Sequence, residues 1–470
     1  MQDARFHTNR HVDRTKRAGE EVTARVEALA VQDVVSWGRA TALFLRLTAL
    51  TILLLGAALL FASDTAMFRG NAAHTGVYDA VGMAQFKDVK WTFHAGGQLI
   101  ASPALEGDTL YVASTSGKLY AVDRAAGTKK WELDLKSRLT SSPAVADGVV
   151  YLAAFDGNLY AVDARAGKVK WQFKTGGERR FSAPHLHGME PAGDKMPDPF
   201  DCWLSSPVVW QGAVYFGSGD DNVYALDAAT GALKWKFATG DVVHASPAIA
   251  DGVLFIGSWD SYFYALDAAT GKEKWRFKTG EDADTHNQQG IQSSAAVADG
   301  MVYFGCRDAH LYALDAKTGE KKWAFDAKGS WVPNSPAVAK GMVYFATSDT
   351  AMLYAANAKT GAIDYAVGFN GWPVFSSPAI AGNMLYAGST EGKLVAIHAP
   401  TGRVVWSFAT DASKQAGLKS YFEPFTTSFY DDVVAAYNKV LTMGSILGSP
   451  VVADKVVYVG SVDGNLYALE

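Results

Sequence analysis

Histidines and carboxylates are concentrated in the middle third of this 470-residue chain, in segments that do not repeat. Imidazole nitrogens with carboxylate neighbours could bind a metal ion or transfer a proton. The candidate side chains are those of His185, His187, His244, His286, Asn287, Asp260 and Asp308. No HExxH or similar spacing on regular structure fixes their geometry, so separate histidines on surface loops are the alternative interpretation.

Tryptophans and arginines outside any repeating pattern could bind a flat or acidic ligand. Aromatic planes suit a flat or sugar-like molecule, although they could equally fill a central channel. Guanidinium groups could hold the carboxylates of a cofactor or an acidic partner, or pair with neighbouring aspartates. The tryptophans are Trp203, Trp259, Trp331 and Trp372. The arginines are Arg138, Arg179, Arg180 and Arg307.

Eight copies of a short cue divide the chain between Ser102 and Pro450. Seven copies read Ser-Pro and the other is Ser294-Ala295, with a base period of about 40 residues. Within a period, short alternating runs of Val, Tyr and Phe are separated by turns such as ADG and ATG, which predicts four short antiparallel strands. No helical periodicity lies between them, so the pattern indicates an all-β propeller rather than a solenoid.

An aromatic residue four positions after the glycine of a late turn marks the outermost strand of each blade. The seven positions are Trp131, Trp171, Trp235, Trp275, Trp323, Tyr365 and Trp406. Trp91 precedes the first cue, whereas the last copy, 449–470, ends before the strand that would carry its tryptophan. The segment from Lys90 to Phe93 is therefore predicted to supply that outer strand. It would close a ring of eight four-stranded antiparallel blades without exposed edges.

Three long insertions interrupt the period, and each enters the innermost strand of a blade. They span 178–204, 281–292 and 411–447. Strand order within a blade places all three on one face of the disc, whereas the opposite face carries only short glycine turns. Long loops in a compact repeat are usually functional. In the third insertion, apolar residues at helical spacing between Val433 and Leu441 predict an amphipathic helix over the disc, as a lid or a docking helix.

The repeat resembles a known family. The phrase YALDAATGxxxWxF at 224–237 and 264–277, with FRGN at 68–71 and HTG at 74–76, is similar to the pyrroloquinoline-quinone-type propeller repeat. The resemblance covers roughly Phe68 to Glu470 and implies an eight-bladed propeller whose repeat tryptophans dock between neighbouring blades. The family includes quinone-dependent alcohol dehydrogenases and the outer-membrane assembly lipoprotein, so the activity stays open.

The resemblance also implies pyrroloquinoline quinone and calcium as the cofactors of the family's enzymes. Those dehydrogenases carry adjacent cysteines and a calcium set of Glu, Asn and Asp. Here the two cysteines, Cys202 and Cys306, are isolated and lack CxxC spacing, so they are interpreted as unpaired thiols. Asn287 with Asp260 or Asp308 is only a loose match to the calcium set. The chain therefore departs from the dehydrogenases of the family.

The N-terminal region predicts a membrane association. Residues 47–62 carry no charge, a length between that of a signal-peptide core and a full bilayer span. A bulky Leu60 at the −3 position argues against cleavage, so an uncleaved anchor is favoured over a cleaved signal. The predicted organisation is a charged cytoplasmic tail at 1–38, an anchor or signal segment at 39–63, a lead-in linker at 64–89 and the propeller at 90–470.

These observations predict a binding or scaffold module at the bacterial cell envelope. The net charge of −5 gives no reason to expect a nucleic-acid partner. The module would be monomeric, tethered to the membrane by 47–62 and located on the extracytoplasmic or periplasmic side, or released there after signal cleavage. Its insertion-bearing face would bind an envelope protein or a small ligand. The alternative is a quinone-dependent dehydrogenase that oxidises an alcohol or a sugar.

Overall fold

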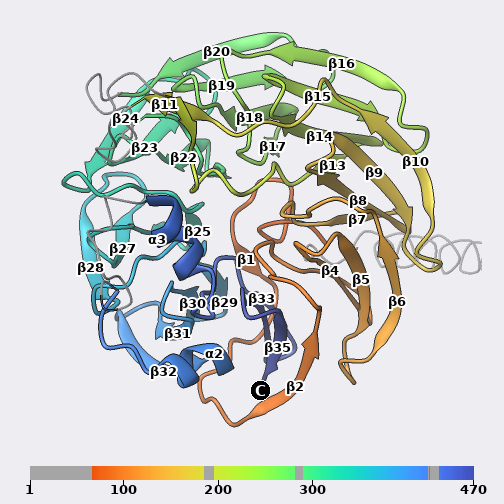
Figure 1. The fold of residues 1–470 in the computed structure, drawn as a ribbon. Coiled ribbons are helices and arrows are strands. Elements are labelled where there is room, and N and C mark those ends of the chain that lie inside the picture. The colour runs from red at the N-terminus through yellow and green to blue at the C-terminus, as the bar shows by residue number, and fades with distance from the viewer. Residues whose placement is uncertain (1–65, 185–194, 281–288, 422, 424–432) are drawn as a thin grey trace, which may run out of the picture. The chain divides into compact units, whose positions relative to one another are not determined.

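The computed structural model describes residues 66–184, 195–280, 289–421, 423 and 433–470. Within them, eight four-stranded antiparallel sheets surround a common axis as the blades of a propeller (Figure 1). The predicted all-β architecture and the number of blades are confirmed. Residues 47–62 lie outside the described part of the chain, and none of the helices within that part is long and apolar enough to cross a membrane.

Each blade runs from a short innermost strand to a longer outer strand. Blade one consists of β3 (Ala104–Glu106), β4 (Thr109–Ala113), β5 (Lys118–Asp123) and β6 (Lys129–Asp134), and blade two of β7 (Ala144–Ala146), β8 (Val149–Ala154), β9 (Asn158–Asp163) and β10 (Val169–Lys174). Blade three consists of β13 (Val208–Trp210), β14 (Ala213–Ser218), β15 (Asn222–Asp227) and β16 (Leu233–Ala238), and blade four of β17 (Ala248–Ala250), β18 (Val253–Gly257), β19 (Tyr262–Asp267) and β20 (Glu273–Lys278). Blade five consists of β21 (Ala296–Ala298), β22 (Met301–Gly305), β23 (His310–Asp315) and β24 (Lys321–Asp326), and blade six of β25 (Ala337–Ala339), β26 (Met342–Ala346), β27 (Met352–Asn357) and β28 (Ile363–Gly368). Blade seven consists of β29 (Ala379–Ala381), β30 (Met384–Gly388), β31 (Lys393–His398) and β32 (Arg403–Ala409), and blade eight of β33 (Val451–Ala453), β34 (Val456–Gly460), β35 (Asn465–Leu469) and β2 (Val89–His94).

The repeat tryptophans join neighbouring blades, as the family resemblance implied. The indole Nε1 of Trp235 donates to the carbonyl of Ala268 in the next blade, at 3.0 Å. Its ring lies on Gly271, where φ is 71° and a Cβ would come within 2.6 Å of the indole, so no larger residue fits. The same bond to the next blade is made by Trp131, Trp171, Trp275 and Trp323. These indoles are half-buried.

The serines of the repeated cue form a belt of hydrogen bonds around the axis. The backbone N–H of Ser246, for example, donates to the Oγ of Ser294 in the next blade at 2.8 Å. The same bond links six further pairs of neighbours, at 2.8 to 3.0 Å: Ser102 to Ser142, Ser142 to Ser206, Ser206 to Ser246, Ser294 to Ser335, Ser335 to Ser377 and Ser449 to Ser102. A serine at this position therefore satisfies a buried backbone donor of the preceding blade.

The first strand of the ring closes the last blade, as predicted. β2 pairs antiparallel with β35, with Trp91 opposite Ala468. The backbone N–H groups of Lys87 and Asp88 donate to the carbonyl of Glu470 at 2.7 and 3.0 Å. The residues just before β2 therefore lie beside Glu470. The indole of Trp91 then donates to Arg124 of the first blade at 3.1 Å, which completes the ring of contacts between blades.

Residues 66–78 run through the centre of the ring, against the innermost strands. The carbonyls of five of them accept hydrogen bonds from the middle residue of innermost strands in blades two, four, five, six and seven; these carbonyls belong to Ala66, Ala72, Ala73, Thr75 and Gly76. The short strand β1 (Val77–Tyr78) then pairs parallel with β29. This segment of the predicted lead-in is therefore an axial element of the propeller, which the sequence pattern did not predict.

Two buried basic side chains hold the axial segment. Arg69 is fully buried and donates to the carbonyls of Pro378 at 2.5 Å and Pro336 at 2.9 Å, so it links the axial segment to the neighbouring blades six and seven. His74 is also fully buried, and burial, helped by the nearby Arg69, lowers its pKa to about 3. The imidazole is therefore neutral at physiological pH. The FRGN and HTG motifs thus have a structural role at the axis.

Candidate functional site

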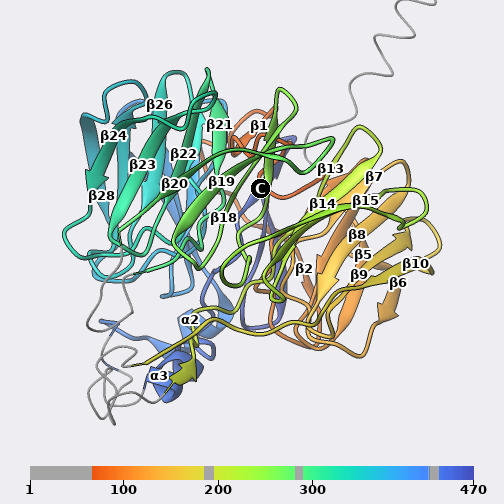
Figure 2. The ribbon, with the colours of Figure 1, turned by 90° about the horizontal axis from the view of Figure 1, so that it is seen from above.

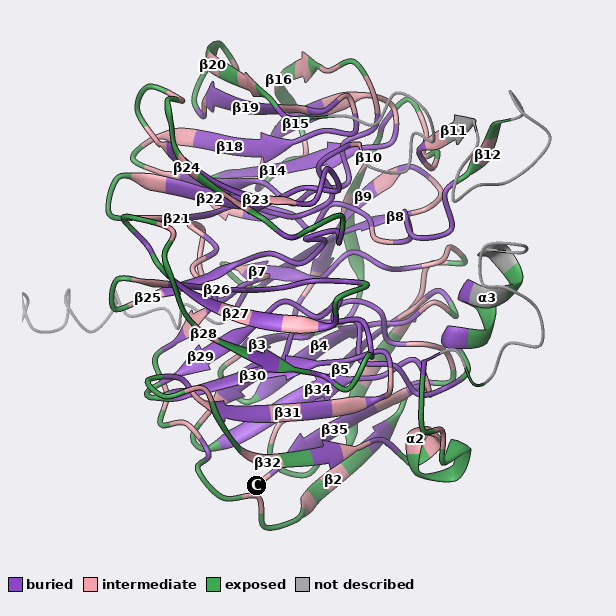
Figure 3. Cartoon of the chain, turned by 90° about the vertical axis from the view of Figure 1, so that its left-hand side faces the viewer, coloured by how far each residue is buried: buried purple, intermediate pink, exposed green. Residues whose placement is uncertain are grey.

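The first and third insertions lie on one face of the disc, as predicted, whereas residues 281–288 of the second lie outside the described residues. The hairpin of β11 (Ser182–Pro184) and β12 (Lys195–Pro197) belongs to the first insertion, and α2 (Asp411–Ala416) and α3 (Val433–Val440) belong to the third. These elements project from the same side of the propeller (Figure 2 and Figure 3). Helix α3 is the predicted helix. Helix α2 was not predicted; Thr410 caps its N-terminus, and Gly417 ends it in the left-handed conformation.

An apolar layer from the first and third insertions closes the axis on this face. The ring of Phe200 stacks on Phe375 and meets the edges of Trp331 and Tyr437, with centroid distances of 5.7, 5.7 and 4.9 Å. Cys202, a free and buried cysteine, belongs to the same cluster, and Cys306 is likewise free and buried. The interpretation of both as unpaired thiols is confirmed. Trp331 fills the channel, which was the alternative to a ligand-binding role.

A small polar cavity remains beneath this layer. Its volume is about 60 Å³, and its walls include the eight serines of the belt, with Phe68 of the axial segment on one side and Gln292 on another. The Oε1 atom of Gln292 is buried without a hydrogen-bond partner. A volume of this size holds roughly two water molecules.

A buried ion network anchors the first insertion to the fourth blade. His244 lies between two carboxylates, with its Nδ1 2.6 Å from Asp201 and its Nε2 3.3 Å from Glu178. The three side chains are 1%, 0% and 3% exposed, respectively. Asp201 also accepts the backbone N–H of Phe181 at 2.6 Å, and Glu178 accepts that of Gly219 at 2.8 Å. His244, expected on the surface of a loop, is instead part of the interior.

The charge state of His244 follows from this environment. Burial alone would lower its pKa, but Asp201 and Glu178 outweigh burial and raise the pKa to about 10. The imidazole is therefore protonated at physiological pH, and both of its N–H groups donate to carboxylates. A protonated histidine with both nitrogens engaged can neither bind a metal ion nor act as a general base at neutral pH.

A second ion pair anchors the same insertion to the fifth blade. Asp198 and Arg307 form a hydrogen-bonded ion pair, and both side chains are at most 1% exposed. The guanidinium lies over two indole rings, at 4.8 Å from the centroid of Trp259 and 3.6 Å from that of Trp331. Phe181 stacks on Trp259 at 4.4 Å with an interplanar angle of 14°. The faces of Trp259 are thus occupied by protein groups and are closed to a flat ligand.

Asp260 and Asp308 have a repeated structural role. The carboxylate of Asp260 accepts the hydroxyl of Tyr264 at 2.6 Å and the backbone N–H of Gly240, from the preceding blade, at 2.7 Å. Asp308 makes the equivalent bonds to Tyr312 and Gly280. The tyrosine bond recurs at Asp156, Asp220 and Asp463. These aspartates therefore join blades, and their recurrence in the repeat is a sequence signal for that role.

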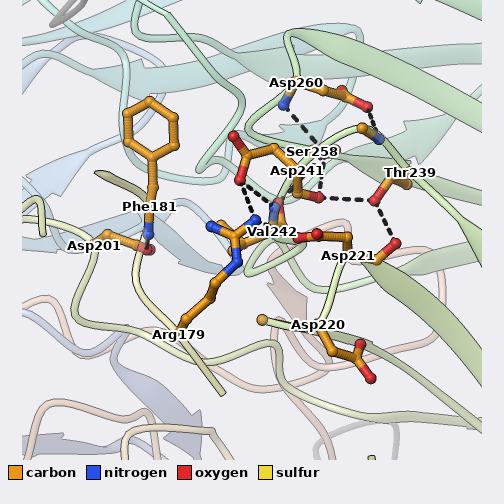
Figure 4. Close-up of polar contacts among 12 residues, drawn as sticks. Arg179, Phe181, Asp201, Asp220, Asp221, Thr239, Asp241, Val242, Ser258 and Asp260 are labelled. Atoms are coloured by element: carbon orange, nitrogen blue, oxygen red, sulfur yellow. Dashed lines mark hydrogen bonds and ion pairs between the residues drawn. The ribbon is translucent and has the colours of Figure 1, made fainter. Parts of the chain in front are cut away.

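Arg179 is an exposed cation of this face. Its guanidinium forms ion pairs with Asp221 at 2.7 Å and Asp241 at 2.9 Å (Figure 4). Figure 4 also shows the carboxylate of Asp201 beside the backbone nitrogen of Phe181. The pairing of arginines with neighbouring aspartates, one of the two interpretations, therefore holds for Arg179.

The remaining candidates are divided between the interior and the segments that are not described. Trp372 is 1% exposed and packs edge-on against Tyr421 of the third insertion at 5.7 Å, whereas Trp203 is half-buried. The four candidates outside the described residues are His185, His187, His286 and Asn287. The structure thus brings His244, Trp259, Arg307 and Trp331 together, but as supports of the insertion.

The burial of Trp259 decides which of two tryptophan substitutions costs more stability. Trp259 is 1% exposed, and a buried tryptophan replaced by alanine costs about 3 kcal/mol or more in the free energy of unfolding. Trp235 of the repeat is half-buried, so Trp235→Ala is expected to cost roughly 2 kcal/mol, from partial burial and one hydrogen bond. Urea unfolding of the two variants measures the difference. A smaller loss for Trp259→Ala than for Trp235→Ala would contradict the burial of Trp259.

The axial cavity and the surroundings of Trp259 do not fit pyrroloquinoline quinone. Small-molecule sites usually have volumes of about 300 to 1,000 Å³, whereas the axial cavity has about 60 Å³. The faces of Trp259 are covered, and no adjacent cysteines are present. Within the described ranges, no group of three His, Cys, Asp or Glu side chains is placed to hold a metal ion.

The candidate residues chosen from the sequence did not include the buried acidic residues of this region. Glu178, Asp198 and Asp201 hold His244 and Arg307, yet none was singled out among the candidates. Asp198 and Asp201 lie in the run PDPFDCW, where charged residues alternate with aromatic and apolar ones. Such a mixture inside a long insertion is a weak signal for a buried anchor, because it combines charge with residues that avoid water.

Comparisons with known proteins agree with this geometry. The sequence matches the family described as outer membrane protein assembly factor BamB over 87–196, 189–323 and 284–419. A search of curated sequences gave no significant match.

Similar structures include BamB from Moraxella catarrhalis, with 18% identity, 82% of this chain and 97% of that chain covered, and a TM-score of 0.59. A europium-containing methanol dehydrogenase has 16% identity, 86% and 97% coverage and a TM-score of 0.62. A quinohemoprotein alcohol dehydrogenase from Comamonas testosteroni has 16% identity, 86% and 80% coverage and a TM-score of 0.62. At these identities the likeness to the structures concerns the fold alone.

Proposed function

The chain belongs to the family of the outer membrane protein assembly factor BamB, and on this premise we propose that it is a binding or scaffold module at the bacterial cell envelope. Residues 47–62 would tether it to the membrane, with the propeller on the extracytoplasmic side. The insertion-bearing face would bind an envelope protein, as a family of assembly factors suggests.

The observation that carries this proposal is the way the first insertion is held. Asp198 pairs with Arg307 of the fifth blade, and Asp201 and Glu178 pair with His244 of the fourth, all in the interior. Burying charges is costly unless each is paired, so such anchors fix the base of an insertion in one position. The axis beneath is filled except for a cavity of about 60 Å³. This arrangement favours a fixed outer surface over a chamber for a substrate.

Site-specific photocrosslinking in a bacterial host tests the binding surface. A photoreactive amino acid at the exposed positions Asn438 or Lys439 of α3 should crosslink the full chain to a partner protein. The same group at the exposed Arg403 or Lys234, on outer strands away from the insertions, is the matched control. Membrane fractionation of the same cells tests the tether. Crosslinks from the control positions alone, or a protein confined to the cytosolic fraction, would contradict the proposal.

The dehydrogenase alternative has a direct test. Purified residues 64–470 incubated with pyrroloquinoline quinone and calcium are expected to retain no chromophore after gel filtration and to show no dye-linked alcohol oxidation, because the axial cavity of about 60 Å³ is smaller than the usual site for a small molecule. A known quinone-dependent dehydrogenase, stripped of cofactor and reloaded in parallel, is the positive control. Stoichiometric retention of the chromophore would overturn the scaffold assignment.

A further inference from the structure

The axial cavity beneath the apolar layer is lined by polar groups and by no carboxylate. All eight belt serines line it, together with Gln292 and His244, and no Asp or Glu belongs to its lining, every residue of which is described. The belt serines are 2% to 6% exposed. The cavity is therefore a buried polar site, and its wall carries no negative charge.

The belt serines have hydroxyl hydrogens that the protein does not use. Seven of the eight Oγ atoms accept a backbone N–H from the preceding blade. Within the described part of the chain, none of the eight hydroxyl groups donates to a protein acceptor. A hydroxyl group has one hydrogen to donate in addition to its lone pairs, and buried donors nearly always have an acceptor. The belt thus places a ring of donors around one small volume.

Arg69 brings a buried positive charge beside this ring. Its guanidinium donates to the carbonyls of Pro336 and Pro378, which directly follow two of the belt serines. Burial lowers the pKa of Arg69 to about 10, so the side chain stays charged at physiological pH. Both of its bonds go to neutral carbonyls, and no described acidic side chain pairs with it. A buried cation without a counter-charge is unfavourable unless an anion lies nearby.

His244 adds a second positive charge, in the wall itself. The imidazole is protonated at physiological pH and lines the cavity, whereas its partners Asp201 and Glu178 do not. The two carboxylates thus lie behind the imidazole, and its positive charge is the one beside the cavity. Both of its N–H groups are engaged, so His244 contributes charge rather than a hydrogen bond.

We propose that the axial cavity binds a monatomic anion, chloride, within the belt of serine hydroxyls. The volume of about 60 Å³ holds roughly two particles of the size of water, which fits one chloride ion and one water molecule. An organic acid has more heavy atoms than this volume admits. A chloride ion only accepts hydrogen bonds, so it matches a wall that consists mainly of donors.

The accompanying water molecule accounts for the unpartnered oxygen of Gln292. The amide nitrogen of this side chain donates to the carbonyl of Phe200 at 2.7 Å, which fixes the orientation of the amide. Its Oε1 atom is then left without a partner. One water molecule can donate one hydrogen to this oxygen and the other to the chloride ion. Two water molecules alone would bring four hydrogens to a lining with one unpartnered side-chain acceptor.

The first test compares two sodium salts at equal ionic strength. The full chain, purified in a neutral detergent, is melted in sodium chloride and in sodium gluconate, whose anion is too large for the cavity. A ligand that binds only the folded state raises the melting temperature, so chloride at about ten times its dissociation constant is expected to raise it by about 2 °C or more. Crystals grown in sodium bromide should show an anomalous peak on the axis, among the belt serines.

Two double variants locate the effect. Ser102→Ala with Ser294→Ala removes two belt hydroxyls on opposite sides of the ring, and the rise in chloride is expected to fall to less than about half. The matched control is Ser141→Ala with Ser293→Ala. These two serines are also buried, but their hydroxyls donate to protein carbonyls at 3.0 and 2.8 Å and do not line the cavity. Both variants lose stability, whereas only the belt variant should lose its response to chloride.

Each outcome decides the proposal. A rise in chloride that is lost in the belt variant and kept in the control supports the site, as does bromide on the axis. An equal rise in all three proteins shows that chloride acts elsewhere and overturns the site. Bromide found only on the surface, or only water on the axis, overturns it as well. If the belt variant does not fold, the bromide crystals of the wild-type protein decide alone.

Discussion

A chain shortened to begin at Gly97 is expected to be unfolded or aggregated. It lacks β2, so the last blade loses its outer strand and exposes an edge, and the indole of Trp91 no longer reaches Arg124 of the first blade. It also lacks Arg69, which links the axial segment to the neighbouring blades six and seven. Circular dichroism, gel filtration and thermal melting compare this chain with one that begins at residue 64.

A circular permutant separates the two losses. Residues 97–470 followed by an Ala-Ala-Thr-Gly turn and residues 87–95 restore the outer strand, because Glu470 already contacts Lys87 and Asp88. The permutant is expected to regain the folded ring but to melt at a lower temperature than the chain that begins at residue 64, since the axial segment is still missing. A shortened chain that melts within a few degrees of the parent would show that neither element closes the ring.

The substitution His244→Ala is expected to lower the free energy of unfolding by about 3 to 5 kcal/mol. It removes the cation between Asp201 and Glu178, whose side chains are 0% and 3% exposed, and so leaves two carboxylates in the interior without their shared partner. Arg179→Ala is the matched control. That arginine also bridges two carboxylates on the same face, but its side chain is 49% exposed and its loss should cost below about 1 kcal/mol.

The contribution of His244 should depend on pH. Its pKa is about 10 in the folded protein and about 6.5 in an unfolded chain, so folding favours the protonated form. The stabilisation is complete below pH 6.5 and is lost as the pH rises towards 10. Urea unfolding should therefore give a larger difference between the wild-type protein and His244→Ala at pH 6 than at pH 9.5. A difference that stays constant or grows over this range would contradict the assigned ion network.

The architecture was predictable because the repeat acts locally. The Ser-Pro cue, the alternating strands and the glycine turns recur in each period, and the missing strand at the C-terminus has a match around Trp91. Each of these features depends on a few neighbouring residues. The axial position of 66–78 was not predictable, because its contacts are single carbonyl bonds to five separate blades and leave no periodic pattern.

The sequence predicted on which face of the disc the candidate site lies, but not that its residues are buried. The first and third insertions do lie on one face (Figure 3), since strand order alone decides to which face a loop belongs. The sequence could not reveal that His244 and Trp259 are buried, because their covering groups come from the first insertion, forty or more residues away in the chain. A histidine exposed on a loop and a histidine buried in an ion network can have the same neighbours in the sequence.

By itself, the sequence determined a closed eight-bladed ring and the face that carries its insertions. These properties follow from local alternation, turn chemistry and the count of repeats, which need no knowledge of distant contacts. The tertiary structure alone decided that Arg307 and His244 support the first insertion, whereas Arg138 and Arg180 remain without an acidic partner among the described residues. The physical reason is that the state of a charged side chain depends on its burial and on the charges beside it, and both are set by segments that meet only in the folded ring.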